Sequence, residues 1–261
     1  MSFETILFSV EQGIARLTLN RPDKLNSFNV TMQGELREVL GRVVAAGGRV
    51  LVLSGAGRGF CAGQDLGDSA VAPGERVDLG KSVEAFYKPI ALALRNLPLP
   101  VIAAVNGVAA GAGANIALAC DIVIATRSAA FVQPFNKLGL VPDSGGTWSL
   151  PRLVGNARAL GLALLGEKLA AEQAAQLGLI WRCVDDGEFR GVVDALATQL
   201  SIAPTLGLAR IKQAIYASWN NSFEQQLDVE RDFQRELGQS EDYAEGVAAF
   251  MQKRAPTFKG R

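Results

Sequence analysis

An apolar, β-branched run that leads into a glycine-rich turn constrains the fold of this chain more than any other feature. Residues 101–105 (VIAAV) have the character of a buried strand, and residues 106–107 (Asn-Gly) are a turn signal. Residues 111–113 (Gly-Ala-Gly) then open an apolar segment with helical spacing. Because the first N–H groups of a helix have no partner within it, a strand, a turn and a helix in this order suit a negatively charged oxygen.

The pattern on either side of this run alternates between strands and helices. It predicts strands at 3–10, 13–19, 49–54, 101–105, 121–125 and 180–184, the first two as a hairpin, and helices at 29–46, 83–94, 112–119, 156–166 and 170–178. Residues 68–81 are polar, contain a Pro-Gly pair and are predicted to form a loop. The strand–helix–strand order predicts an α/β fold whose buried strands pair in parallel.

The last part of the chain has a different pattern. From residue 189 onward it is helical in spacing, with Ser240 as the expected N-cap of the last helix. We therefore predict a core of residues 1–200, which holds the active site, and an all-helical region of residues 201–261. The apolar faces of these helices need a cover, which is either the core or a neighbouring subunit.

The charge balance and the missing histidine exclude several classes of function. Lysine plus arginine equals aspartate plus glutamate at 26 each, so neither nucleic acid nor an anionic membrane is expected as a partner. The chain has no histidine. This absence removes Ser-His-Asp and Cys-His catalysis and most zinc or haem sites, so no metal is expected.

The cysteines and the N-terminal sequence bear on the cellular compartment. Cys61, Cys120 and Cys183 are widely spaced, which favours buried thiols in a reducing compartment over a disulfide framework. We find no signal-peptide pattern and no apolar run of about 18 residues. A cytoplasmic protein outside the membrane is therefore expected.

Two small-residue turns, at residues 60–64 and 111–113, each follow a predicted strand. Parallel strands put their carboxyl ends on one side of a sheet, so N–H groups of both turns can converge on one carbonyl oxygen. Alternatively, each glycine cluster serves only the close packing of a helix on a sheet.

Asp143 stands between a proline and a Ser-Gly-Gly run, and two roles are open for it. Aspartate is a preferred N-cap, so its carboxylate can begin the helix through Trp148. Alternatively, Leu138, Leu140, Val141 and Trp148 surround the carboxylate with apolar surface. They would then raise its pKa and suit it to proton transfer near neutral pH.

A set of motifs resembles the enoyl-CoA hydratase/isomerase (crotonase) superfamily over nearly the whole chain. These motifs are residues 19–22 (LNRP), 25–26 (LN), 59–65 (GFCAGQD), 100–107 (PVIAAVNG), 120–121 (CD), 145–147 (GGT) and 150–152 (LPR). The resemblance implies an α/β crotonase fold, in which ββα units wind into a spiral. It also implies that the helical C-terminal region serves trimerisation, as a homotrimer or as a hexamer made of two trimers.

The resemblance implies an acyl-CoA thioester as the substrate, bound in a bent form. No separate cofactor is expected, since coenzyme A is part of the substrate. The thioester oxygen would lie in an oxyanion hole between the backbone N–H groups of Gln64 and Ala112. By position in the motifs, these two residues belong to the two turns described above.

Further substrate contacts fall on Ala62, Asp65 and Leu66, in the same motif as Gln64. Lys24 is a candidate for the CoA phosphates by its position after the hairpin. Lys253 is another, and a neighbouring subunit could supply it. Each lysine can equally be a solvated surface charge.

Two positions depart from the hydratases of this superfamily. Asn115 and Phe135 stand where hydratases carry the two glutamates that activate and protonate water. An amide and a phenyl ring cannot exchange protons, so hydration is not expected. Asp143 stands where isomerases of the superfamily often carry their acid/base group. The resemblance therefore implies one carboxylate that moves a proton within the substrate while the oxyanion hole stabilises the enolate.

Finer matches resemble one subfamily of isomerases. Residues 55–66, 106–114, 137–140 and 142–148 are similar to the ring-1,2-epoxyphenylacetyl-CoA isomerases of aerobic phenylacetate degradation, which expand an aromatic epoxide to an oxepin-CoA. A 3-enoyl to 2-enoyl-CoA isomerase of fatty-acid oxidation uses the same proton chemistry and is the alternative. A non-catalytic acyl-CoA-binding subunit is a second alternative, because both glutamates are missing.

Overall fold

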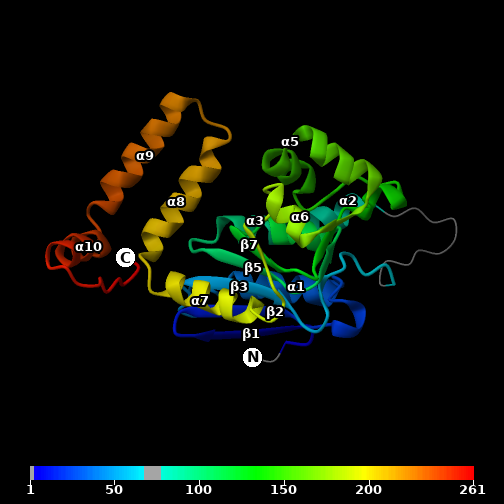
Figure 1. The fold of residues 1–261 in the computed structure, drawn as a ribbon, viewed down its shortest axis with the longest axis horizontal. Helices are drawn as coiled ribbons and strands as arrows, with labels where there is room; N and C mark the ends of the chain where they lie inside the picture. The colour runs from blue at the N-terminus through cyan, green and yellow to red at the C-terminus, as the bar shows by residue number, and fades with distance from the viewer. Residues whose placement is uncertain (1–2, 68–77) are drawn as a thin grey trace.

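The computed structural model describes residues 3–67 and 78–261, and within these ranges the strands form two sheets (Figure 1). The larger sheet has six strands in the order β1-β2-β3-β5-β7-β10, and the smaller has four in the order β4-β6-β8-β9. Their bounds are β1 Ile6–Glu11, β2 Ile14–Leu19, β3 Val50–Gly55, β4 Gly59–Cys61, β5 Val101–Val105, β6 Val108–Ala110, β7 Ile122–Thr126, β8 Ala130–Val132, β9 Lys168–Ala170 and β10 Arg182–Val184.

The chain alternates between the two sheets, which gives it a spiral course. β3, β5 and β7 lie side by side in the larger sheet, and each is followed after a short turn by β4, β6 and β8 of the smaller sheet. All of these neighbours pair in parallel, so the carboxyl ends of β3, β5 and β7 meet at the edge where the chain crosses over. The predicted α/β fold with ββα units is confirmed.

The helices follow the expected order, with several changes in their bounds. They are α1 Val30–Leu40, α2 Leu79–Ser82, α3 Lys88–Asn96, α4 Ala112–Leu118, α5 Gly146–Leu165, α6 Ala171–Gln176, α7 Phe189–Ser201, α8 Thr205–Ser218, α9 Phe223–Leu237 and α10 Glu241–Met251. Shorter helical segments are the 3-10 turns η1 Pro22–Lys24 and η3 Pro134–Leu138 and the π turn η2 Val83–Tyr87.

Three predicted boundaries differ from the structure. α1 ends at Leu40, although Asn29 caps its start as expected by accepting a hydrogen bond from the Met32 amide (2.9 Å). α5 begins at Gly146, well before the predicted residue 156, and Gly155 breaks its helical geometry with φ 77°. Of the predicted loop at 68–81, residues 68–77 lie outside the described residues, and α2 occupies residues 79–82.

The larger sheet is covered on both faces because its central strands are apolar along their length. Leu51 and Leu53 of β3 belong to the main hydrophobic core, together with side chains of α1 and α3. Val50 and Val52 point the other way and pack against α7. The alternation along β3 therefore fills two separate cores, as expected of a strand buried on both faces.

The helices α8, α9 and α10 reach away from the sheets as a C-terminal arm (Figure 1). A buried ion pair joins the arm to the core: Lys212 of α8 lies 2.9 Å from Asp121, which precedes β7. The Tyr216 hydroxyl donates to the same carboxylate (2.7 Å). Ser240 caps α10 as predicted, accepting from the Tyr243 amide (3.0 Å). The division at residue 200 remains a prediction.

The cysteines and the helices allow two further comparisons with the sequence. Cys61, Cys120 and Cys183 are free thiols; the first two are buried as predicted, whereas Cys183 is partly exposed. Among the described residues no single helix has the length and apolar composition to span a membrane. The bent pair α7 and α8, at 105°, meets these limits only when taken together.

Candidate active site

The two predicted glycine turns lie against each other at the edge where the chain crosses between the sheets. A Cβ on Gly63 would lie 2.9 Å from the carbonyl oxygen of Ala110 and 3.5 Å from the amide nitrogen of Ala112. A Cβ on Gly113 would lie 2.4 Å from the carbonyl oxygen of Cys61. Neither position has room for a side chain, so glycine at these positions allows the close approach of the two turns.

The backbone directs one amide of each turn toward the space between them. Phe28 and Gln64 form an isolated parallel bridge, through the Gly63 carbonyl and the Asp65 amide. In extended backbone successive N–H groups point to opposite sides, so the Gln64 amide points away from Phe28. Ala112 is the first residue of α4, where N–H groups have no acceptor within the helix. This geometry agrees with the predicted oxyanion hole.

Gly111 makes the second turn possible. It is the N-cap of α4 with φ 54° and ψ −128°, a backbone conformation that L side chains rarely adopt. A Cβ at this position would lie 3.7 Å from the ring of Phe135, which is buried on η3. The Phe135 ring thus forms an apolar wall beside this turn.

Asp143 lies in the turn before α5 and does not act as its N-cap. The N-cap is Gly145, and no side chain bonds to the helix start. The Asp143 carboxylate instead accepts a hydrogen bond from the Ser144 hydroxyl (2.9 Å). Burial raises the pKa of the carboxyl group, while the bonds from Ser144 and from its own backbone N–H oppose the rise. The result is a carboxylate whose pKa is raised toward neutrality.

The apolar residues expected around Asp143 are only partly where the sequence placed them. Leu138, Leu140 and Val141 are themselves 56%, 41% and 75% exposed, so they contribute little to the burial of the carboxylate. Trp148 is half-buried and packs against the ring of Trp219, the C-cap of α8, with ring centroids 4.3 Å apart and planes at 46°. The direction of the predicted pKa shift is confirmed, but its expected cause is wrong for the three exposed residues.

Asn115 has a structural function that the sequence did not indicate. Its Nδ2 donates to the backbone carbonyl of Asp143 (2.9 Å), and its Oδ1 accepts from Gln133 Nε2 (2.8 Å). The Gly146 amide donates to the same Asp143 carbonyl (2.8 Å). Both amide side chains are buried. Asn115 therefore holds the loop that carries Asp143.

The predicted substrate contacts in the first turn lie together, but one of them has another partner. Asp65 forms an ion pair with Arg21 (2.8 Å), in which both side chains are mostly buried. The hydrogen bond from Arg21 lowers the pKa of Asp65, and the charge of Lys24 adds to this effect. Leu66 is 60% exposed and Ala62 half-buried beside it. The ion pair gives Asp65 a role in holding the turn.

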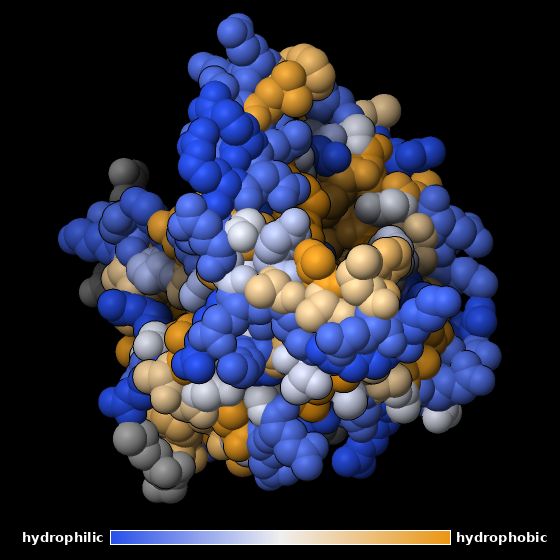
Figure 2. Space-filling view, turned by 90° about the vertical axis from the view of Figure 1, so that its left-hand side faces the viewer, coloured by the Kyte–Doolittle hydropathy of each residue, from blue (hydrophilic) through white to orange (hydrophobic). Residues whose placement is uncertain are grey.

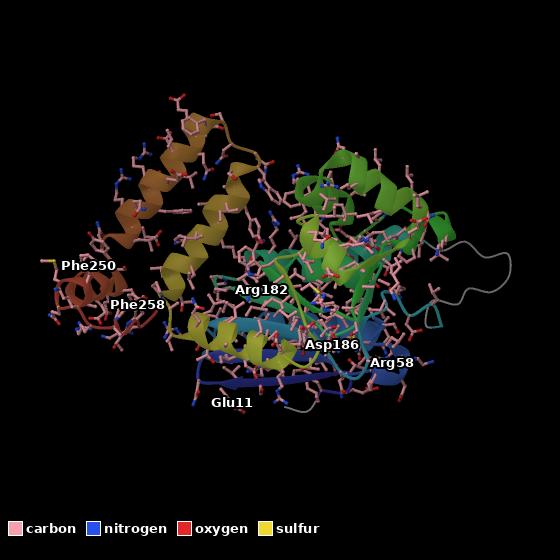
Figure 3. The ribbon with its side chains drawn as sticks, viewed as in Figure 1. Glu11, Arg58, Arg182, Asp186, Phe250 and Phe258 are labelled. Atoms are coloured by element: carbon pink, nitrogen blue, oxygen red, sulfur yellow. The ribbon has the colours of Figure 1, made fainter. Side chains whose placement is uncertain are left out.

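Lys253 is remote from these turns within one protomer. It follows α10, whose end lies on the opposite side of the molecule from α5 and the Asp143 loop (Figure 1). Phe250 and Phe258, on either side of Lys253 in the sequence, mark this position (Figure 3). A contact between Lys253 and the CoA phosphates thus requires a neighbouring subunit.

Comparison with known proteins gives consistent results. Residues 9–261 match the family model described as enoyl-CoA hydratase/isomerase. The chain is 57% identical over 260 residues to the 1,2-epoxyphenylacetyl-CoA isomerase of Escherichia coli, covering 99% of both chains. It is 34% identical to the trans-2-decenoyl-[acyl-carrier-protein] isomerase of Streptococcus mutans, covering 100% of both. The crystal structure of an enoyl-CoA hydratase from Bacillus anthracis superposes with a TM-score of 0.93 at 30% identity, over 99% of this chain and 100% of that one.

The contact between Asn115 and the Asp143 loop can be tested through Gly146. A Cβ there would lie 2.3 Å from Asn115 Nδ2, so Gly146→Ala should lower the free energy of unfolding by about 1–3 kcal/mol. Gly161→Ala, on the same helix with nothing within 4 Å, is the matched control. It should raise that free energy by about 0.5–1 kcal/mol. Urea denaturation measures both, and equal effects would show that the contact is not tight.

Proposed function

The chain belongs to the enoyl-CoA hydratase/isomerase family, and on that premise we propose that it isomerises an acyl-CoA thioester. The substrate we propose is 1,2-epoxyphenylacetyl-CoA, which the enzyme would convert to an oxepin-CoA in aerobic phenylacetate degradation. The 57% identity to the Escherichia coli isomerase supports this substrate. The observation that carries the reaction type is Asp143, whose pKa is raised by burial and which stands without the two hydratase glutamates.

The proposed reaction needs one base that later acts as an acid. The Asp143 carboxylate removes a proton from the carbon next to the thioester, and the electron pair of that C–H bond moves into the thioester. The amides of Gln64 and Ala112 stabilise the resulting enolate oxygen. The epoxide opens to the seven-membered ring, and Asp143 returns its proton to a ring carbon. No atom is added and no cofactor takes part, so the step is a balanced isomerisation.

Asn115 and Phe135 make the addition of water an unfavourable alternative. The amide group of Asn115 is hydrogen-bonded to the Asp143 carbonyl and to Gln133, and Phe135 has only a phenyl ring without a proton-transfer group. Neither residue can deprotonate water. We therefore expect this chain to move a proton within the substrate rather than to add water. The reducing environment suited to its free thiols agrees with a cytoplasmic enzyme.

Replacement of the carboxylate tests the proposed reaction. Asp143→Asn should lower kcat by at least about 100-fold, because an amide cannot carry the proton, while the affinity for an acyl-CoA changes little. The control is Asp186→Asn, at an exposed carboxylate bonded to the Ser128 amide (Figure 3). Turnover near the wild-type rate in Asp143→Asn would contradict the mechanism. A wild-type protein that binds acyl-CoA without turnover would favour the non-catalytic role.

The substrate is tested by comparing thioesters on the wild-type enzyme. The rate on 1,2-epoxyphenylacetyl-CoA should exceed the rate on a straight-chain 3-enoyl-CoA. The reverse order would favour the fatty-acid isomerase. The name of the Streptococcus mutans relative, an isomerase of a decenoyl thioester, supports keeping this alternative.

The pH dependence of kcat/KM follows from the same assignment. Only the carboxylate form of Asp143 can accept the proton, so activity falls as pH decreases through its raised pKa. Ser144→Ala removes a hydrogen bond that favours the charged form, so the pKa should rise further. The acid limb of the profile should then move to higher pH. An unchanged acid limb in Ser144→Ala would indicate that another group controls it.

We infer that the C-terminal arm is covered by other copies of the chain, in a trimer or a hexamer. Figure 2 faces this side of the molecule and shows apolar residues among the charged ones. Pro204, Leu237 and Phe258 help to line an apolar concavity of about 400 Å³ between the helices. The large apolar residues exposed on the arm are Ile211, Ile215, Phe223, Leu227, Tyr243, Val247, Phe250 and Met251. Contiguous apolar surface of this kind is typical of subunit interfaces.

A charge on this surface tests the assembly. Phe250→Glu, at a residue 82% exposed, should shift the mass measured by light scattering from three or six chains toward one. Val44→Glu, at an exposed apolar residue before β3, should leave the mass unchanged. A wild-type protein that is already monomeric would contradict the inferred assembly.

A further inference from the structure

The turn that carries the Gln64 amide, one donor of the proposed oxyanion hole, is joined to Phe28 by an isolated backbone bridge. Phe28 and Gln64 form an isolated parallel bridge, outside both sheets. The Phe28 amide donates to the Gly63 carbonyl (2.7 Å), and the Asp65 amide donates to the Phe28 carbonyl (2.9 Å). Because the Gly63 carbonyl and the Gln64 N–H belong to one peptide plane, the bridge sets the direction of that N–H. Whatever holds the bridge therefore holds the oxyanion donor.

Tyr87 contacts both members of the bridge. Its ring meets Phe28 edge to face, with centroids 5.9 Å apart and planes at 76°. Its hydroxyl donates a hydrogen bond to Oε1 of the Gln64 side chain. Phe28 is fully buried and Tyr87 is 3% exposed, so both contacts are protected from water. One side chain thus packs against one strand of the bridge and bonds to the other.

The local sequence explains how Tyr87 comes to face this bridge. It is the last residue of the π turn η2, just before Lys88 and Pro89. Pro89 has no N–H, so it cannot donate to the Ala85 carbonyl as a regular helix would require. Arg37 of α1 donates to that carbonyl instead (3.1 Å). A π turn of this kind changes the direction in which the following side chains point.

We propose that Tyr87 is a positioning residue for the enolate, which clamps Phe28 and Gln64 so that the Gln64 amide keeps its direction in the oxyanion hole. The inference rests on the proposed function, because it needs an enolate oxygen at that amide. Tyr87 acts through the backbone of Gln64 and exchanges no proton. Loss of its hydroxyl leaves the ring against Phe28 but removes the bond from Tyr87 to the Gln64 side chain.

The surroundings keep the hydroxyl in its donating form. Burial raises the pKa of Tyr87, and the nearby Asp143 and Cys61 raise it further, while Gln33 lowers it slightly. The phenol therefore stays protonated over the working pH range of the enzyme.

The test measures enolate formation separately from isomerisation. Phenylacetyl-CoA can exchange the protons next to its thioester with D2O, and NMR or mass spectrometry follows the exchange. Tyr87→Phe should slow the exchange at saturating thioester about tenfold and change KM by less than about twofold, since the oxyanion hole acts more on the enolate than on the ground state. Isomerisation of the epoxide thioester should slow by the same factor.

Two further variants separate positioning from general stability. Tyr216→Phe removes the hydroxyl of a half-buried tyrosine that also donates to a side-chain oxygen, here that of Asp121 (2.7 Å). It should lower the denaturation midpoint but leave the exchange rate unchanged. Gln64→Met removes the acceptor of the Tyr87 hydroxyl and keeps the backbone amide. It should resemble Tyr87→Phe, and the double variant should be no slower than either single one.

Each outcome decides a different point. Wild-type exchange rates in Tyr87→Phe, or additive losses in the double variant, would overturn the clamp. Equal rate losses in Tyr87→Phe and Tyr216→Phe would also overturn it, in favour of a general effect of stability. Exchange in the wild type without isomerisation of the epoxide would refute the proposed substrate and leave the clamp supported by the exchange data. No exchange in the wild type would overturn both.

Discussion

The close approach of two backbones, at Gly63 and Gly113, is the constraint on which the site depends. A Cβ on Gly113 would meet the Cys61 carbonyl at 2.4 Å, so any larger residue would push the turn at 60–64 away from α4. The approach is possible because β4 and β6 pair in parallel directly before the two turns. An oxyanion hole made of two amides from distant parts of the chain thus requires two sheets, two short crossings and glycine where the backbones touch.

The loop that carries Asp143 is held by a buried amide, that of Asn115. Asn115 lies in α4, about one turn after Ala112, whose amide we propose for the oxyanion hole. As an amide it can donate to the Asp143 carbonyl and accept from Gln133 at the same time, which a carboxylate cannot do. The residue thereby connects the oxyanion helix to the acid/base loop. The Asn115 side chain thus cannot transfer a proton, and it fixes the Asp143 loop.

The C-terminal arm is also connected to this loop. Arg95 of α3 lies over the ring of Tyr216 (3.5 Å) and over that of Trp148 (4.2 Å). Trp148, in the first turn of α5, packs in turn on the ring of Trp219, the C-cap residue of α8. Such cation–π contacts contribute about 0.5–2 kcal/mol each. The helix that begins after Asp143 is therefore packed against the arm that we infer to form the subunit interface.

The sequence alone determined the α/β fold, the two glycine turns and the identity of the acid/base candidate. These features are local: a β-branched run, a glycine cluster and a lone carboxylate are visible in a few consecutive residues. It did not reveal β4, β6, β8 and β9, because strands of three residues are too short to show a period of two. Only the tertiary structure decided that Asp143 is no helix cap, that Asn115 holds its loop and that Tyr87 contacts the bridge at Gln64. The contacts of Asn115 and Tyr87 join residues far apart in the chain, whose distance depends on the tertiary fold.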